Sequence, residues 1–137
     1  MSKFDQLVAA LSSVNEAKIP VMSNDRCIPW KMQAILARQL FKELGVKRGL
    51  ISVTTPNYAN ASCVYVTMPK PEVDVAITDS GAVNLHWLEA RERMEKLSLK
   101  VKEIIARAFP RHDDRSEYGT DYYDFCWLFK FECGTMA

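Results

Sequence analysis

The spacing of apolar residues changes twice along this chain, and the change constrains the fold more than any other feature of the sequence. Before residue 45, apolar residues recur at the three- and four-residue intervals of helices. Between residues 50 and 78 they form β-branched runs or alternate with polar residues, and helical spacing returns over residues 85–109. The pattern predicts an α+β domain with two helices before a small sheet and a third helix before its last strand.

Two amphipathic helices are predicted at the start of the chain. The first begins after Ser2, whose hydroxyl can cap it together with Asp5, and it ends before Pro20. The second opens at Pro29, and Gly45 supplies the left-handed residue that often follows a helix. The predicted buried faces are Phe4, Leu7, Val8, Leu11 and Val14 in the first helix, and Met32, Ile35, Leu36, Leu40 and Leu44 in the second.

Strands are predicted in four further segments. Residues 50–55 and 62–68 are rich in β-branched side chains and predict two antiparallel strands around a polar loop. Alternation over residues 73–78 predicts a short additional strand, with a turn at Asp79-Ser80-Gly81 after it. The aromatic residues 122–132 predict the final strand.

A long helix is predicted over residues 85–109, with Asn84 as its N-cap and Pro110 after its end. The order is then α-α-β-β-(β)-α-β, where parentheses mark the strand whose formation the sequence leaves open. It predicts a single domain over residues 1–137, with a small antiparallel β-sheet and helices packed on one face. The apolar stripe predicted for the long helix consists of Leu88, Leu97, Val101, Ile104 and Ala108.

Charge is unevenly distributed, although 18 Lys+Arg and 17 Asp+Glu leave a formal net charge of only +1. Residues 1–68 have a net charge of +4, residues 69–110 of zero and residues 111–137 of −3. The small total excludes a histone-like wrapper of nucleic acid and an acidic mimic of DNA, because both need a large excess of one sign. It does not exclude local basic or acidic surfaces.

An acidic and aromatic segment precedes the final strand: residues 112–127 contain five carboxylates and five aromatic rings. Tyrosine and tryptophan beside charged groups are typical of protein-binding surfaces. The alternative is an exposed loop that leads into an edge strand. The partner-binding residues predicted here are Asp113, Asp114, Glu117, Tyr118, Asp121, Tyr122, Tyr123, Asp124 and Trp127.

A basic ridge is predicted on the second helix. Lys31, Arg38 and Lys42 fall on one side of it, opposite the leucine stripe, and Lys47 and Arg48 follow its end. Such a ridge can meet phosphates or an acidic protein. Cations also occupy the solvated side of ordinary amphipathic helices, which is the simpler interpretation.

Catalytic patterns are sparse. A metal-dependent hydrolase or nuclease would use His112, Asp113, Asp114 and Asp121, although their spacing matches no complete metal-binding motif. No nucleotide-binding glycine motif and no nucleophile motif is present, and Cys27 is the best candidate for a reactive thiol. We expect no catalysis, no metal and no cofactor.

Three local features together resemble a known family. They are Asp114-Arg115-Ser116, Thr120-Asp121-Tyr122-Tyr123-Asp124, and the strand pair that follows an amphipathic helix. In these residues the chain resembles the small "large polyvalent protein associated" domains of phage and plasmid proteins. The resemblance implies a mobile-element accessory protein, such as an anti-CRISPR-type inhibitor that binds and blocks a host defence nucleoprotein complex without catalysis. The alternatives are a nucleic-acid-binding module that uses the basic ridge and, less favoured, the metal-dependent enzyme.

The cellular environment is predicted from patterns that are missing. The first residues do not form a secretory leader, and no apolar run reaches membrane length, so we expect a cytoplasmic protein with reduced cysteines and no membrane partner. The oligomeric state stays open, since an exposed final strand would allow a homodimer by strand pairing.

Overall fold

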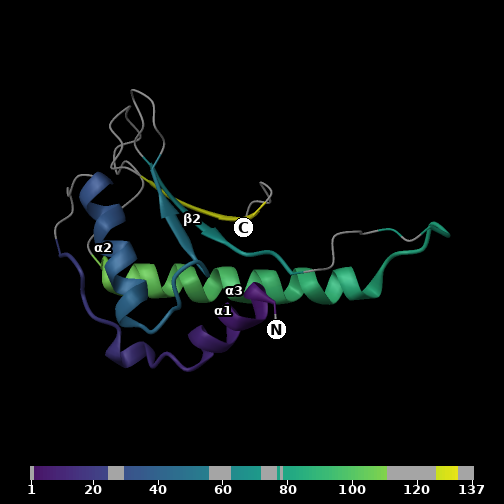
Figure 1. Ribbon diagram of the computed structural model, residues 1–137, viewed down its shortest axis with the longest axis horizontal. Helices are drawn as coiled ribbons and strands as arrows, with labels where there is room; N and C mark the ends of the chain where they lie inside the picture. The colour runs from purple at the N-terminus through teal and green to yellow at the C-terminus, as the bar shows by residue number, and fades with distance from the viewer. Residues whose placement is uncertain are drawn as a thin grey trace.

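A computed structural model describes residues 2–24, 30–55, 63–71, 77, 79–110 and 126–132. The chain forms three α-helices, a short 3₁₀ helix and a three-stranded sheet in these segments (Figure 1), which confirms the α+β class. The elements are α1 (Lys3–Ser12), η1 (Glu16–Lys18), α2 (Trp30–Glu43), β1 (Ser52–Thr54), β2 (Cys63–Met68), α3 (Leu85–Ala108) and β3 (Cys126–Phe131).

The sheet is mixed, with strand order β1-β2-β3 and β2 at its centre. β1 and β2 are antiparallel as predicted, with Val53 opposite Val66. β2 and β3 are parallel, with Val64 opposite Trp127, so the prediction of an antiparallel sheet is wrong. The reason is the connection: α3 lies between the two strands in sequence, and a helical crossover allows the chain to re-enter the sheet in the same direction.

The additional strand predicted over residues 73–78 lies almost wholly outside the described residues. Ile77 is described and forms an isolated antiparallel bridge with Val83. Gly81, between them, has a φ of 83°, a left-handed conformation that glycine adopts without strain. The turn predicted at residues 79–81 is therefore confirmed.

The start of α1 is held by the predicted cap. The Ser2 hydroxyl accepts a hydrogen bond from the Asp5 N–H at 3.2 Å and donates one to the Asp5 carboxylate at 2.8 Å. Phe4, Leu7 and Leu11 are buried, as their spacing predicts. The helix ends at Ser12, earlier than expected, and the chain continues through η1 to Pro20.

The buried face of α2 differs from the predicted one. Met32 and Ile35 are 48% and 52% exposed, whereas Gln33, Ala34 and Phe41 are buried. α2 packs against β1 and β2, and its small alanines allow the helix to approach the sheet closely. The helix is therefore rotated toward Ala34 and Phe41, and its predicted apolar face is wrong at its first two positions.

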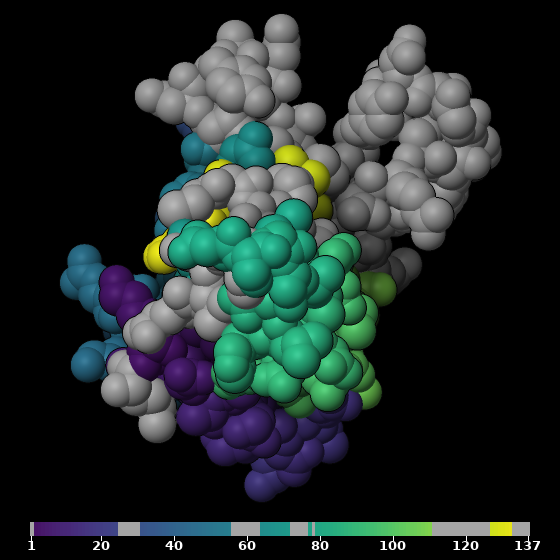
Figure 2. All heavy atoms as spheres, turned by 90° about the vertical axis from the view of Figure 1, so that its right-hand side faces the viewer, coloured from purple at the N-terminus to yellow at the C-terminus, as the bar shows by residue number. Residues whose placement is uncertain are grey.

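Helix α3 has the predicted N-cap, since the Asn84 side chain accepts a hydrogen bond from the His86 N–H at 3.0 Å. Leu97, Val101, Ile104 and Ala108 are buried as predicted. Leu88 is 43% exposed, because the first turns of α3 extend beyond the sheet (Figure 1). Figure 2 is viewed from the side on which this end of α3 projects.

The core lies on one face of the sheet. Val64, Val66 and Met68 alternate along β2 with the partly exposed Tyr65 and Thr67. This alternation is the pattern of a sheet that is covered by helices on one side, which agrees with the predicted architecture. None of the helices in the described segments has the length and apolar content needed to cross a membrane.

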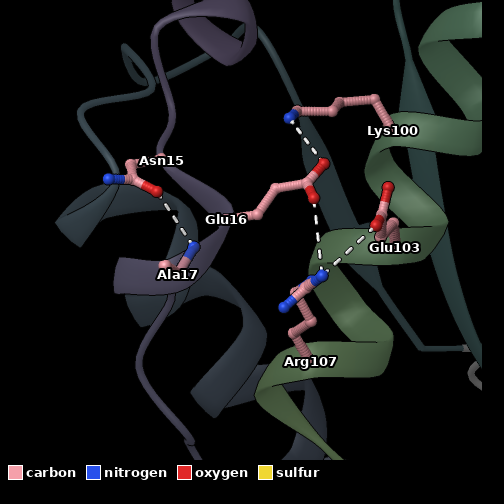
Figure 3. Close-up of polar contacts among 6 residues, drawn as sticks. All are labelled: Asn15, Glu16, Ala17, Lys100, Glu103 and Arg107. Carbon is pink, nitrogen blue, oxygen red and sulfur yellow. Dashed lines mark hydrogen bonds and ion pairs between the residues drawn. The ribbon is translucent and has the colours of Figure 1, made fainter.

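Charged contacts join the N-terminal elements to α3. The Glu16 carboxylate on η1 accepts a hydrogen bond from Lys100 Nζ at 3.1 Å and lies 3.4 Å from Arg107, which also contacts Glu103 at 3.6 Å (Figure 3). The hydrogen bond from Lys100 is the main cause that lowers the pKa of Glu16. η1 is thereby fixed against the second half of α3.

Candidate functional site

The chain turns sharply at the end of α2, and this turn begins the candidate site. The Gly45 N–H donates to the Lys42 carbonyl at 3.1 Å, and the Val46 N–H donates to the Phe41 carbonyl at 3.0 Å. These two bonds, with Gly45 at a φ of 84°, form the Schellman motif. Val46 and Phe41 are both buried, so the chain re-enters the core directly after the helix. The predicted role of Gly45 is confirmed.

A second turn presents two cations. The Leu50 N–H donates to the Lys47 carbonyl at 3.2 Å, and Gly49 has a φ of 92°. Leu50 is buried, whereas Lys47 and Arg48 are exposed. The two cations are therefore held outward by buried residues on either side.

Arg38 connects α2 to the sheet. Its Nε donates a hydrogen bond to the Val53 carbonyl on the edge strand β1 at 2.9 Å. A guanidinium has five N–H donors, so this bond fixes the group and leaves four donors for another acceptor. Lys42 lies one helical turn further along α2, on the same side of the helix.

Between α2 and β1 lies a hollow of 690 Å³, a volume within the range of ligand-binding sites. Four of the five residues of the predicted basic ridge line it. Lys31 does not, because it lies on the first turn of α2, far from the end where the hollow opens. The lining residues are Arg38, Phe41, Lys42, Val46, Lys47, Arg48, Gly49, Ile51, Ser52 and Val53.

The hollow is strongly positive. Within the described part of the chain, no carboxylate pairs with any of its four cations. Glu43 is the single carboxylate in residues 30–55, and it accepts a hydrogen bond from Gln39 at 3.2 Å. Unpaired cations in a concave surface concentrate positive potential and attract anions.

The residues that line the hollow include no histidine, cysteine or carboxylate. Its side chains that can take part in acid–base or nucleophilic chemistry are Lys42, Lys47 and Ser52. The four cations of the lining give the arrangement the charge needed to bind an anion.

The predicted acidic and aromatic site falls mostly outside the described residues. Trp127 is the exception: it is 8% exposed, and its ring lies 5.2 Å from the Phe109 ring. Trp127 therefore packs in the core, and its role as a partner-binding residue stays a prediction. The predicted residues outside the described segments are Asp113, Asp114, Glu117, Tyr118, Asp121, Tyr122, Tyr123 and Asp124.

The residues predicted for a metal site and for a reactive thiol also lie outside the described residues. His112, with Asp113, Asp114 and Asp121, lies outside the described segments, and so does Cys27. Over the segments that are described, no three His, Cys, Asp or Glu side chains come together in a group that could hold a metal ion.

The apolar part of the hollow was not predicted from the sequence. Phe41, Val46 and Ile51 contribute to its lining beside the cations. One local signal pointed to this region: glycines at positions 45 and 49 flank the Lys47-Arg48 pair, a spacing that favours two successive turns.

Comparison of the chain with protein-family models, curated proteins and solved structures gave no match. The resemblance to domains of phage and plasmid proteins therefore stays a prediction. The function is argued below from the site itself.

Proposed function

We propose that this chain is a non-catalytic nucleic-acid-binding protein that contacts phosphates with the cations of the hollow. The observation that carries the proposal is that Arg38, Lys42, Lys47 and Arg48 line one concave surface without a carboxylate partner in the described segments. Lysine and arginine are the side chains that supply most phosphate contacts in nucleic-acid complexes.

The geometry favours phosphates over a single carboxylate. Two of the cations come from α2 and two from the turn after it, so they approach the hollow from different elements. Arg38 is already oriented by its hydrogen bond to Val53, and a fixed guanidinium can bind phosphate through two parallel hydrogen bonds. A chain of phosphates would satisfy several of these cations together.

Charge reversal at the exposed turn tests the proposal. The double variant Lys47→Glu/Arg48→Glu is expected to lower affinity for a labelled oligonucleotide at least tenfold, as measured by fluorescence anisotropy at low salt. The matched control is Lys3→Glu/Lys18→Glu, which changes the net charge equally at exposed positions that do not line the hollow. Equal losses in the two variants would contradict the proposal.

The inhibitor role implied by the resemblance is our second proposal. Large apolar side chains are exposed where α3 begins, at the opposite end of the long axis from α2 (Figure 1), and such clusters favour a protein partner. They are Ile77, Val83, Leu85 and Leu88.

Phage infection of cells that carry an active CRISPR system tests the second proposal. Expression of the chain is expected to raise plaque counts. The double variants Leu85→Asp/Leu88→Asp and Asp121→Ala/Asp124→Ala are expected to lose the effect, and the exposed Leu99→Asp control is expected to keep it. Plaque counts that stay unchanged across a panel of such systems would refute it.

A further inference from the structure

The wall of the basic hollow is apolar to an extent that phosphate binding does not require. Phe41, Val46, Ile51 and Val53 line it together with the four cations. Phe41, Val46 and Val53 are almost fully buried, whereas Ile51 is partly exposed. A ligand in the hollow would therefore meet both the four cations and the exposed hydrocarbon of Ile51.

We propose that the hollow binds a single-stranded nucleic acid, with its phosphates on the cations and one unpaired base against the apolar wall. This inference rests on the proposed function and adds the class of nucleic acid. A base has an apolar face and a polar edge, whereas the outside of a duplex presents phosphates and sugars, which would leave the apolar wall unused.

The availability of unpaired bases also favours a single strand. Bases in a duplex are stacked and paired, and moving one out of the stack costs free energy. A single strand has its bases available, and proteins bind them on apolar and aromatic side chains or on arginine planes. Arg38 supplies such a plane at the edge of the hollow, held in place by the Val53 carbonyl.

Ile51 is the residue best suited to test the base contact. It follows the Lys47-Arg48 turn, lines the hollow and is the apolar lining side chain with a partly exposed surface. Replacing it by serine removes hydrocarbon without changing the charge that phosphates meet. Leu99→Ser, at an exposed position on α3 away from the hollow, is the matched control.

The experiment compares three labelled ligands by fluorescence anisotropy at one salt concentration. They are an oligothymidine of about 16 nucleotides, near the upper end of single-domain binding sites, a duplex of equal length, and an abasic oligomer with the same backbone. We expect the oligothymidine to bind about tenfold tighter than the other two, because it alone offers an unpaired base to the apolar wall.

The Ile51→Ser variant is expected to lose most of this preference, with its affinity for the abasic oligomer unchanged and the Leu99→Ser control like the wild type. Circular dichroism of each variant confirms that the fold is kept. Equal binding of the oligothymidine and either other ligand would overturn the inference and leave the proposed function standing. Binding of none of the three would overturn both.

Discussion

Replacing Gln33 by methionine is expected to stabilise this protein. Gln33 is 0% exposed on the buried face of α2. Neither its amide oxygen nor its amide nitrogen has a hydrogen-bond partner among the residues that the structure describes. A buried polar group without a partner lowers stability, because it loses its hydrogen bonds to water on folding and gains none.

The size of the effect follows from the chemistry of the two side chains. An unsatisfied buried amide costs about 1–3 kcal/mol. Methionine has a similar length, fills irregular space in a core and has a comparable helix propensity, so the exchange adds little strain. The free energy of unfolding should rise by about 1–3 kcal/mol, which corresponds to a Tm increase of roughly 3–10 °C for a chain of this size.

Urea unfolding, followed by circular dichroism at the helical band, measures this change. The control is Gln39→Met, an exposed position on the same helix, where a change within about 0.5 kcal/mol is expected. If Gln33→Met lowered the free energy of unfolding, the amide would have a hydrogen-bonding partner in the folded protein and the reasoning would be refuted.

Three further predictions concern the fold. The hydrogen bond from Lys100 lowers the pKa of Glu16, so the ionised Glu16 stabilises the fold above its ordinary pKa of 4.5, and this stabilisation is lost as the pH falls through the lowered pKa. The Tm difference between wild type and Glu16→Gln should therefore shrink between pH 6 and pH 3, and a constant difference would contradict this prediction. Ile104 is fully buried, so Ile104→Ala should lower the free energy of unfolding, measured by urea unfolding, by about 2–5 kcal/mol. Leu88→Ala, at a half-exposed position, should cost less than ~1 kcal/mol, and similar losses in the two variants would contradict the burial of Ile104. Gly45→Ala should cost about 1–2 kcal/mol in the same assay because alanine is strained at a φ of 84°, so an unchanged midpoint would speak against the Schellman turn.

Local signals in the sequence predicted the starts of α1 and α3 and the end of α2, but not the end of α1 at Ser12. Ser2 with Asp5, Asn84 and Gly45 each act on backbone groups within a few residues, so their roles depend little on the rest of the fold. The direction of β3 could not be obtained in this way. Its parallel pairing with β2 depends on the path of the chain through α3, and the apolar pattern of a strand is the same in both directions.

The rotation of α2 shows a second limit. Met32 and Ile35 are more apolar than Ala34 and Ala37, so the sequence favours them as core residues. In the fold the alanines are buried, because α2 packs closely on the sheet and small residues fit that contact. Tertiary packing overrides the local pattern here.

The candidate site was predictable in part. Helical spacing places Arg38 and Lys42 on one side of α2, and the pair Lys47-Arg48 is visible as a charged turn. The hollow itself could not be predicted, because Phe41 and Ile51 come together only when β1 packs beside α2.

The salt dependence of oligonucleotide binding is the most direct test of the proposed function. If a single strand places phosphates on all four cations of the hollow, the logarithm of the binding constant should fall with the logarithm of salt concentration with a slope of about −3. Lys47→Ala/Arg48→Ala should reduce the magnitude of the slope by about half, and Lys3→Ala/Lys18→Ala should leave it unchanged. A slope near zero, or one that the first double variant does not alter, would contradict binding at the hollow.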